Sequence, residues 1–272
     1  MKYQFALIGL LFLSSTSYAD RIAIYHGSGV WGPSTSQTKS LLRRMGHTIQ
    51  NLTAAQIRHG DLRTGEFRAI FIPGGASWVY AADLGELGQK EIRTFVEGGG
   101  GYLGTCAGAF LALSDRIGGA VTGPFGLGLI HGTSVDPFRL GIKGFGNGMK
   151  KIRFHMAGFK NYFKVLFLEG PFLRISPEAL ERQNGVVVAH YSNGEIAAAA
   201  FESGRGRVFI TGPHMEVDEK RTRLRFRFHD PDSEWPILKL WISYLLGGPQ
   251  PEIQAGNTQN LKKRIVVDHE WG

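Results

Sequence analysis

Residues 98 to 114 read GGGGYLGTCAGAFLALS, and this stretch predicts a short strand, a sharp turn that carries one cysteine, and a helix. Two apolar residues after the four glycines form the strand, and the small and apolar residues after the cysteine suit a buried helix. Gly104 and Gly108 lie two residues before and two residues after Cys106. This is the spacing of a nucleophile elbow, in which glycines let neighbouring backbone approach without a Cβ clash.

Cys106 is the only cysteine of the chain. A strand-to-helix corner points the sulfur away from the sheet edge and places it at a helix N-terminus, where the backbone dipole stabilises a thiolate. The alternative is a buried and inert small apolar residue, as lone cysteines commonly are. The glycine pair around the corner favours chemistry, so we interpret Cys106 as a nucleophile.

The elements before Cys106 alternate between strands and helices. Strands are predicted at 21–25, 47–52 and 67–72, and helices follow each of them, the first capped by Ser34 or Ser36 and the last covering 87–97. This order predicts an α/β fold with a parallel sheet covered on both faces, and ligands bind such sheets at the carboxyl ends of the strands. The second half is predicted to be β-rich, with strands at 150–154, 164–168, 186–191, 196–201 and 207–212, before an apolar helix at 234–246.

The predicted strand at 207–212 leads into GPHMEV, which contains His214 and Glu216. A thiol nucleophile needs a base that takes its proton and an acid that orients the base. Side chains two residues apart in an extended segment lie on one side, so Glu216 could hold one nitrogen of His214 while the other faces the sulfur of Cys106.

A glycine turn at Gly74 and Gly75 follows the strand at 67–72. Such turns leave backbone N–H groups free to face a ligand, although a simple tight turn is the alternative. We expect the N–H of Ala107, together with that of Gly74 or Gly75, to bind the oxyanion of a tetrahedral intermediate.

A second glycine pattern, Gly27, Gly29 and Gly32, has the G-x-G-x-x-G spacing of a dinucleotide site directly after a strand. Pro33 crowds the start of the following helix, and no Asp or Glu stands within residues 47 to 53 to hold a ribose. The pattern therefore argues weakly for a nucleotide, and no cofactor is predicted. The histidines other than His214 show no paired metal-ligand spacing, so no metal site is predicted either.

The N-terminus has the pattern of an export signal: Lys2, a short apolar run at 5–13, and the small residues of a cleavage site before Asp20. The apolar run is too short to span a bilayer, so no transmembrane segment is expected after signal removal. We predict a signal peptide at 1–19, one domain at 20–248 and a polar tail at 249–272, and we expect an exported protein, periplasmic or secreted.

The chain has 272 residues and a formal net charge of +8. Part of this charge lies in RTRLRFRFHD, where Arg221, Arg223 and Arg225 alternate with mostly apolar residues and form a candidate anion-binding face. The alternative is a solvated edge strand whose charges deter edge pairing. No nucleic-acid motif is present, and basic charge alone supports only nonspecific attraction.

Three segments resemble the signatures of the class I glutamine amidotransferase-like superfamily, most closely its biotin-protein ligase N-terminal-like domain: IFIPGGASWVY, FVEGGGGYLGTCAGAFLAL and FITGPHMEV. HGSGV, EGPF and YSNGEIAAAAF also fit, so that the resemblance spans roughly 21 to 246. It implies a flavodoxin-like, mostly parallel sheet with Cys106 as nucleophile, His214 as base and Glu216 as orienting acid. The chain departs from the superfamily at Met215, where proline is usual, which bears on how rigidly His214 and Glu216 are held.

No segment after residue 246 is long enough for the catalytic part of a biotin ligase, so the resemblance does not imply ligase activity. The sequence instead favours a cysteine hydrolase or acyl transferase that acts on a small-molecule or peptide amide, or a related acyl bond, through a thioester. The alternatives are a non-catalytic binding or scaffold protein that uses the same pocket, and a thiol redox or stress sensor. The substrate and the oligomeric state are open.

Overall fold

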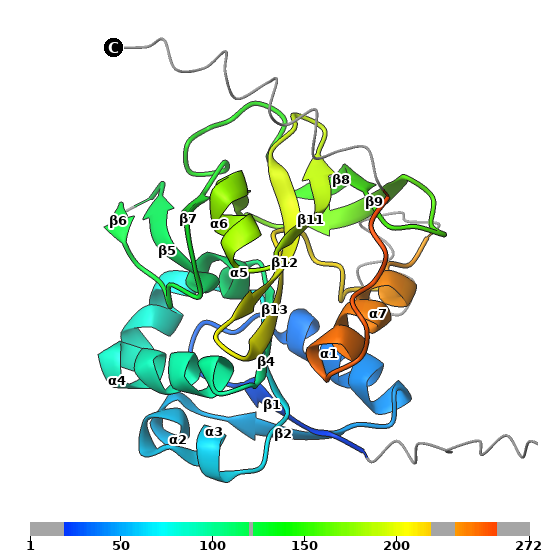
Figure 1. The fold of residues 1–272 in the computed structure, drawn as a ribbon. Helices are drawn as coiled ribbons and strands as arrows, with labels where there is room; N and C mark the ends of the chain where they lie inside the picture. The colour runs from blue at the N-terminus through cyan, green and yellow to red at the C-terminus, as the bar shows by residue number, and fades with distance from the viewer. Residues whose placement is uncertain (1–18, 120–121, 219–231, 255–272) are drawn as a thin grey trace, which may run out of the picture.

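The computed structural model describes residues 19–119, 122–218 and 232–254. These residues form a single sheet of 13 strands with helices packed on both faces (Figure 1). Residues 1–18 of the proposed signal sequence and the arginine-rich stretch with Arg221, Arg223 and Arg225 lie outside the described residues. Within the described ranges, no helix is both long and apolar enough to cross a membrane.

The first half of the chain builds the parallel part of the sheet. Its strands run in the spatial order β2, β1, β3, β4, and their bounds are β1 Arg21–Tyr25, β2 Thr48–Leu52, β3 Ala69–Ile72 and β4 Gly101–Thr105. Strands β3 and β4 are completely buried because helices cover both of their faces. The alternation predicted from the sequence is therefore confirmed.

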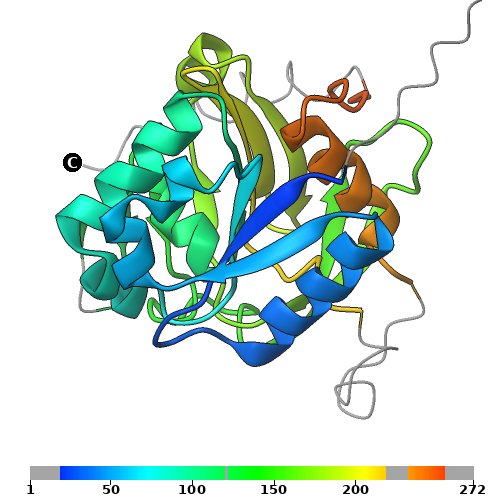
Figure 2. The same ribbon diagram turned by 90° about the horizontal axis from the view of Figure 1, so that it is seen from below.

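The helices divide between the two faces, as Figure 2 shows. One face carries α1 (Gly32–Arg44) and α7 (Trp235–Leu245). The other carries α2 (Ala54–His59), α3 (Asp61–Thr64), α4 (Ser77–Glu97) and α5 (Ala107–Ala112). The sequence predicted only the second part of α4, because Gly85 interrupts the helical pattern and adopts a φ of 60° there.

The second half adds antiparallel strands and returns to the parallel sheet. Its elements are β5 Leu113–Ile117, β6 Gly123–Pro124, β7 Ile130–Val135, β8 Gly148–Phe154, β9 Tyr162–Phe167, β10 Phe172–Arg174, α6 Pro177–Arg182, β11 Val186–Tyr191, β12 Ile196–Ser203 and β13 Gly206–Thr211. Strand β13 pairs in parallel with β4, whereas β12 pairs antiparallel with β13. The end of β13 therefore lies beside the end of β4, although about a hundred residues separate them in the sequence.

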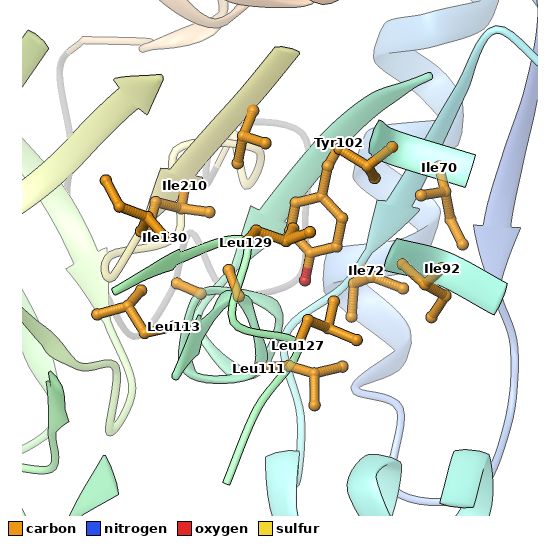
Figure 3. Close-up of a cluster of buried hydrophobic side chains, with 14 of the residues drawn as sticks. Ile70, Ile72, Ile92, Tyr102, Leu111, Leu113, Leu127, Leu129, Ile130 and Ile210 are labelled. Atoms are coloured by element: carbon orange, nitrogen blue, oxygen red, sulfur yellow. The ribbon is translucent and has the colours of Figure 1, made fainter. Parts of the chain in front are cut away.

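A cluster of buried apolar side chains supports the turn after β4. Figure 3 shows Tyr102 of β4 among aliphatic side chains that include Ile72, Leu127 and Leu129. The Tyr102 hydroxyl donates a hydrogen bond of 2.7 Å to the carbonyl oxygen of Gly108 in α5. Burial raises the pKa of Tyr102 well above 10, so this donor keeps its proton.

Two local expectations differ from the structure. Neither Ser34 nor Ser36 caps α1: Trp31 occupies the N-cap position, and Ser34 lies inside the first turn with its side chain buried. The tail was expected to be loose, but its first residues are hydrogen-bonded to the folded domain: the N–H of Gln254 donates to the carbonyl oxygen of His155. The remainder of that tail lies beyond the described ranges.

Candidate active site

Cys106 occupies the corner between β4 and α5, as the sequence predicts. Its φ of 50° and ψ of −102° lie in a region that residues other than glycine rarely adopt. The backbone N–H of Cys106 donates to the Thr211 carbonyl oxygen at 2.8 Å, which ties the corner to the end of β13. A strained corner of this kind costs of order 1–3 kcal/mol and persists only where the surrounding structure holds it.

The two flanking glycines are required by close backbone contacts. A Cβ atom at Gly108 would lie 2.1 Å from the carbonyl oxygen of Ile72, and one at Gly104 would lie 2.7 Å from the carbonyl oxygen of Gly108. Both distances are shorter than those that real Cβ atoms show. The spacing around Cys106 therefore reflects how tightly α5 packs against β3 and β4.

His214 follows β13 and lies in the same pocket as Cys106. Its Nδ1 contacts Glu216 Oε1 at 2.8 Å, and its ring packs edge-on with that of Trp31 at a centroid distance of 4.7 Å. Its backbone N–H donates to the Leu166 carbonyl oxygen at 2.7 Å. The structure thus brings together the cysteine, the histidine and the glutamate that the sequence singled out.

Burial alone would lower the pKa of His214, but the Glu216 charge and a hydrogen bond with the Cys106 side chain outweigh it and raise the pKa to about 10. The imidazole is completely enclosed, with 1% of the residue exposed, and Glu216 is 0% exposed. The Glu216 carboxylate thus favours the protonated form of the His214 imidazole, in the pocket that also contains Cys106.

The segment with His214 and Glu216 is a turn rather than the extended strand that we expected. The N–H of Val217 donates to the His214 carbonyl oxygen at 3.3 Å, and that of Met215 donates to the Pro213 carbonyl oxygen at 3.2 Å. The turn places Glu216 next to the ring of His214. Met215 is fully buried in the core with Trp235 and Trp241, so the side chain that replaces the usual proline anchors this turn.

Ser34 connects the two halves of the site, a role that no sequence pattern indicates. Its Oγ donates to Glu216 Oε1 at 2.6 Å and accepts the backbone N–H of Gly74 at 2.9 Å. Glu216 Oε2 is buried without a hydrogen-bond partner among the described residues. Ser34 is therefore the side chain that orients the carboxylate of Glu216, and only the packing of α1 against the turn reveals it.

Gly74 is therefore not the oxyanion donor, because its N–H already has a hydrogen-bond partner. Its N–H is taken by Ser34 Oγ, and its carbonyl oxygen accepts from the Tyr80 hydroxyl at 2.9 Å. Within the described part of the chain, no backbone hydrogen bond is found from the N–H of Gly75 or of Ala107. Of the two glycines offered by the sequence, Gly75 is thus the one with a free donor, and it lines the pocket with Cys106.

The pocket has a volume of about 370 Å³ and is open to solvent. This is within the range of about 300–1,000 Å³ typical of small-molecule sites. It is lined by Gly29, Val30, Trp31, Gly75, Ala76, Cys106, Leu168, Glu169 and His214. The loop after β1, whose glycines resembled a dinucleotide motif, thus forms one wall of the cysteine pocket.

The segment after β9 forms another wall. The Cys106 thiol donates to the Leu168 carbonyl oxygen at 3.4 Å. The next residue, Glu169, adopts a φ of 54° and contributes to the pocket lining. The sequence singled out this segment only as part of EGPF, and it assigned no role to Glu169.

A buried cation lies behind the site. Arg116 is 6% exposed and pairs with Asp136 at 3.1 Å, and its guanidinium stacks over Phe110 at 4.4 Å. Burial lowers its pKa, whereas the charges of Asp136 and Cys106 oppose that shift. Its Nη1 also donates to Ser77 Oγ at 2.6 Å, which fixes the first turn of α4.

Comparisons with known proteins agree with this architecture. The family model described as the N-terminal part of biotin-protein ligase matches residues 20–132. An uncharacterised protein of Chlamydia muridarum is 26% identical over 210 residues, which cover 72% of this chain and 80% of the relative. The pyridoxal 5'-phosphate synthase subunit PdxT of Deinococcus radiodurans is 30% identical over 145 residues, which cover 48% of this chain and 68% of the relative.

Solved structures share the fold at low sequence identity. A glutamine amidotransferase superimposes with a TM-score of 0.57 at 18% identity, covering 84% of this chain and 99% of the other. A putative GMP synthase component from Thermoplasma acidophilum gives a TM-score of 0.55 at 14% identity, covering 90% and 98%. The chain belongs to the class I glutamine amidotransferase-like superfamily, and its residues 20–132 match the model of the N-terminal part of biotin-protein ligase.

Proposed function

We propose that the protein is a cysteine-dependent hydrolase or acyl transferase that cleaves an amide or related acyl bond through a thioester on Cys106. The observation that carries the proposal is the shared pocket in which Cys106 meets an imidazole held by Glu216. The superfamily supports the same reaction class, because glutamine amidotransferases are among the proteins with this fold.

In the first half of the reaction, Cys106 gives its proton to His214, and the sulfur then attacks the carbonyl carbon and forms a tetrahedral intermediate. The imidazolium of His214 then gives its proton to the leaving nitrogen, so the C–N bond breaks and ammonia or an amine departs. The raised pKa of His214, about 10, keeps this proton available at neutral pH. The acyl group remains on Cys106 as a thioester.

In the second half, the neutral imidazole of His214 takes a proton from water or from another nucleophile. That nucleophile attacks the thioester carbonyl, the C–S bond breaks, and the acid or the transferred product leaves. The sulfur and His214 return to their starting protonation states. Glu216 holds one tautomer and orientation of the imidazole throughout, and Ser34 holds Glu216.

The negative oxygen of both tetrahedral intermediates needs fixed donors. We propose the backbone N–H groups of Gly75 and Ala107, which stand next to the start of α4 and at the start of α5 respectively. Gly75 lines the pocket together with Cys106, and Ala107 directly follows Cys106 in the chain. The place of Gly75 in the pocket lining and that of Ala107 directly after Cys106 in the chain support this assignment.

The first test measures alkylation of Cys106 by iodoacetamide, which is unambiguous because the chain has one cysteine. At pH 6 a free thiol with a pKa of about 8.5 is less than about 1% thiolate. We expect Cys106 to react at least about tenfold faster than free cysteine at this pH, and His214→Ala to remove the advantage. Equal rates for wild type and free cysteine would refute an activated nucleophile.

The second test measures ammonia release from a panel of primary amides, with Cys106→Ala as the inactive control. A reactive Cys106 without turnover of any amide or ester would favour the binding or scaffold role instead. Reversible oxidation of Cys106 by dilute peroxide, detected by mass spectrometry in the absence of turnover, would favour the sensor role.

We also propose that the protein is exported and begins near Asp20 in its mature form. The support is the pattern at residues 1–19, and the first strand, β1, begins at Arg21, the second residue of the proposed mature protein. The mass of the protein recovered outside the cytoplasm tests this, since an uncleaved chain or a purely cytoplasmic location would contradict it.

A further inference from the structure

The pocket around Cys106 contains an acidic side chain that the proposed reaction does not use. Apart from Cys106 and His214, Glu169 is the only ionisable residue that lines the pocket within the described residues. The neighbouring walls come from Gly29, Val30 and Trp31, which are uncharged. The pocket therefore offers a carboxylate, and no lysine or arginine from the described part of the chain, to a bound molecule.

Glu169 is not a partner of the catalytic histidine. Glu216 occupies His214 Nδ1, and the groups that raise the pKa of His214 are Glu216 and Cys106. The Glu169 carboxylate accepts a weak hydrogen bond, from Asn147 Nδ2 to Oε1 at 3.4 Å. A half-buried carboxylate with a neutral and distant donor remains available to a ligand.

The backbone holds Glu169 in place at an energetic cost. Four residues other than glycine have a positive φ in the described ranges, and two of them, Cys106 and Glu169, line this one pocket. The segment cannot relax easily, because a Cβ at Gly170 would lie 2.0 Å from the carbonyl oxygen of Gly212. Strain that is fixed by tight packing occurs preferentially at functional sites.

We propose that Glu169 is the specificity residue of this site and binds a cationic group of the substrate. The inferred substrate class is an amide or acyl compound that carries an ammonium or similar cation close to the carbonyl attacked by Cys106. Trp31, which also lines the pocket, adds an aromatic surface for the bound cation. The inference rests on the proposed function for the identity of the reactive carbonyl, but the charge preference itself can be measured without turnover.

The experiment compares three methanethiosulfonate reagents that differ in charge: 2-aminoethyl (cationic), methyl (neutral) and 2-sulfonatoethyl (anionic). Each transfers its alkylthio group to the Cys106 sulfur and releases methanesulfinate, so one S–S bond forms as another breaks. Rates are divided by those of free cysteine to remove intrinsic reactivity. In wild type we expect the cationic reagent to be favoured over the anionic one by at least about tenfold, equivalent to about 1.4 kcal/mol, with the preference falling as salt rises.

Glu169→Gln should abolish most of this preference, and Glu169→Lys should reverse it. The matched control is Glu66→Gln, because Glu66 also has a φ of 54° but is exposed and lies between α3 and β3, outside the pocket. The proposal is overturned if wild type shows no cationic preference, or if Glu169→Gln behaves like Glu66→Gln. The measurement on wild type alone decides whether the pocket prefers the cationic reagent, even if a variant folds poorly.

The two proposals fail in different ways. If the neutral reagent reacts no faster with Cys106 than with free cysteine, and His214→Ala changes nothing, the activated nucleophile fails. A normal neutral rate without any charge preference removes only the role of Glu169. Once a substrate is found, N-acetylation of its amine should raise KM in wild type by at least about tenfold and have little effect in Glu169→Gln.

Discussion

The hydroxyl of Ser34 offers the sharpest test of the site's internal design, because one atom serves two buried groups. Ser34 Oγ donates to Glu216 Oε1 at 2.6 Å and accepts from the Gly74 N–H at 2.9 Å, and the residue is 0% exposed. In Ser34→Ala, the carboxylate loses a donor and the N–H of Gly74 loses its acceptor. No water replaces them readily at a position enclosed on all sides.

The expected cost follows from these two contacts. Loss of a hydrogen bond to a charged group costs about 1.5–3 kcal/mol, and an unpaired buried N–H costs about 1–3 kcal/mol. Alanine in a helix gains about 0.5 kcal/mol over serine. We therefore expect Ser34→Ala to lower the free energy of unfolding by about 2–5 kcal/mol.

Urea denaturation followed by tryptophan fluorescence measures this change. With a slope of about 3 kcal/mol per molar urea, the midpoint should fall by about 1 M. The matched control is Ser36→Ala in the same helix, because Ser36 bonds only to the Pro33 carbonyl oxygen at an exposed site. A Ser34→Ala midpoint that equals the Ser36→Ala midpoint would refute the bridging role of Ser34.

Three further predictions concern packing and pH. Gly108→Ala places a Cβ 2.1 Å from the Ile72 carbonyl oxygen, so urea denaturation should show a loss of about 3 kcal/mol, whereas Gly32→Ala, in open space, should be near neutral. The pKa of His214 is raised from 6.5 to about 10, so the stability that protonated His214 contributes is complete below pH 6.5 and is lost as the pH rises toward 10. The urea midpoint of wild type should therefore fall between pH 6.5 and about pH 10, and that of His214→Gln should fall less. Burial, and then the charge of His190, lower the pKa of His155 to about 4. The contribution of neutral His155 to the free energy of unfolding is therefore complete above pH 6.5 and is lost as the pH falls toward 4. In His155→Asn the urea midpoint should depend less on pH over this acid range.

The strand-to-helix corner could be predicted because its signals are local. Gly104, Cys106 and Gly108 stand in one short stretch, and the apolar pattern changes from strand to helix at the cysteine. Signals of the same local kind accompany two features that the structure shows: Thr53 caps α2 with Gln56 in a capping box, and a turn at 193–194 joins β11 and β12. Each feature depends on residues that are neighbours in the chain.

The contact between His214 and Glu216 was predicted correctly, but the backbone conformation from which it was predicted was wrong. The sequence suggested an extended segment, but the N–H of Val217 closes a turn onto the His214 carbonyl oxygen. Nothing between Gly212 and Asp218 distinguishes these conformations by pattern alone. The side chain of Met215 is packed in a core built from distant elements, and such long-range packing cannot be seen in the local pattern.

The sequence alone determined the α/β alternation, the elbow at Cys106 and the three residue types of the candidate catalytic group, because periodicity and glycine spacing act over a few neighbouring residues. Only the tertiary structure decided that Ser34 orients Glu216, that the Gly74 N–H is already occupied, and that Glu169 shares a pocket with the sulfur. The physical reason is that these contacts join α1, β3, β9 and β13 across as many as 182 positions. Such contacts depend on how the helices pack on the sheet, which no local pattern encodes.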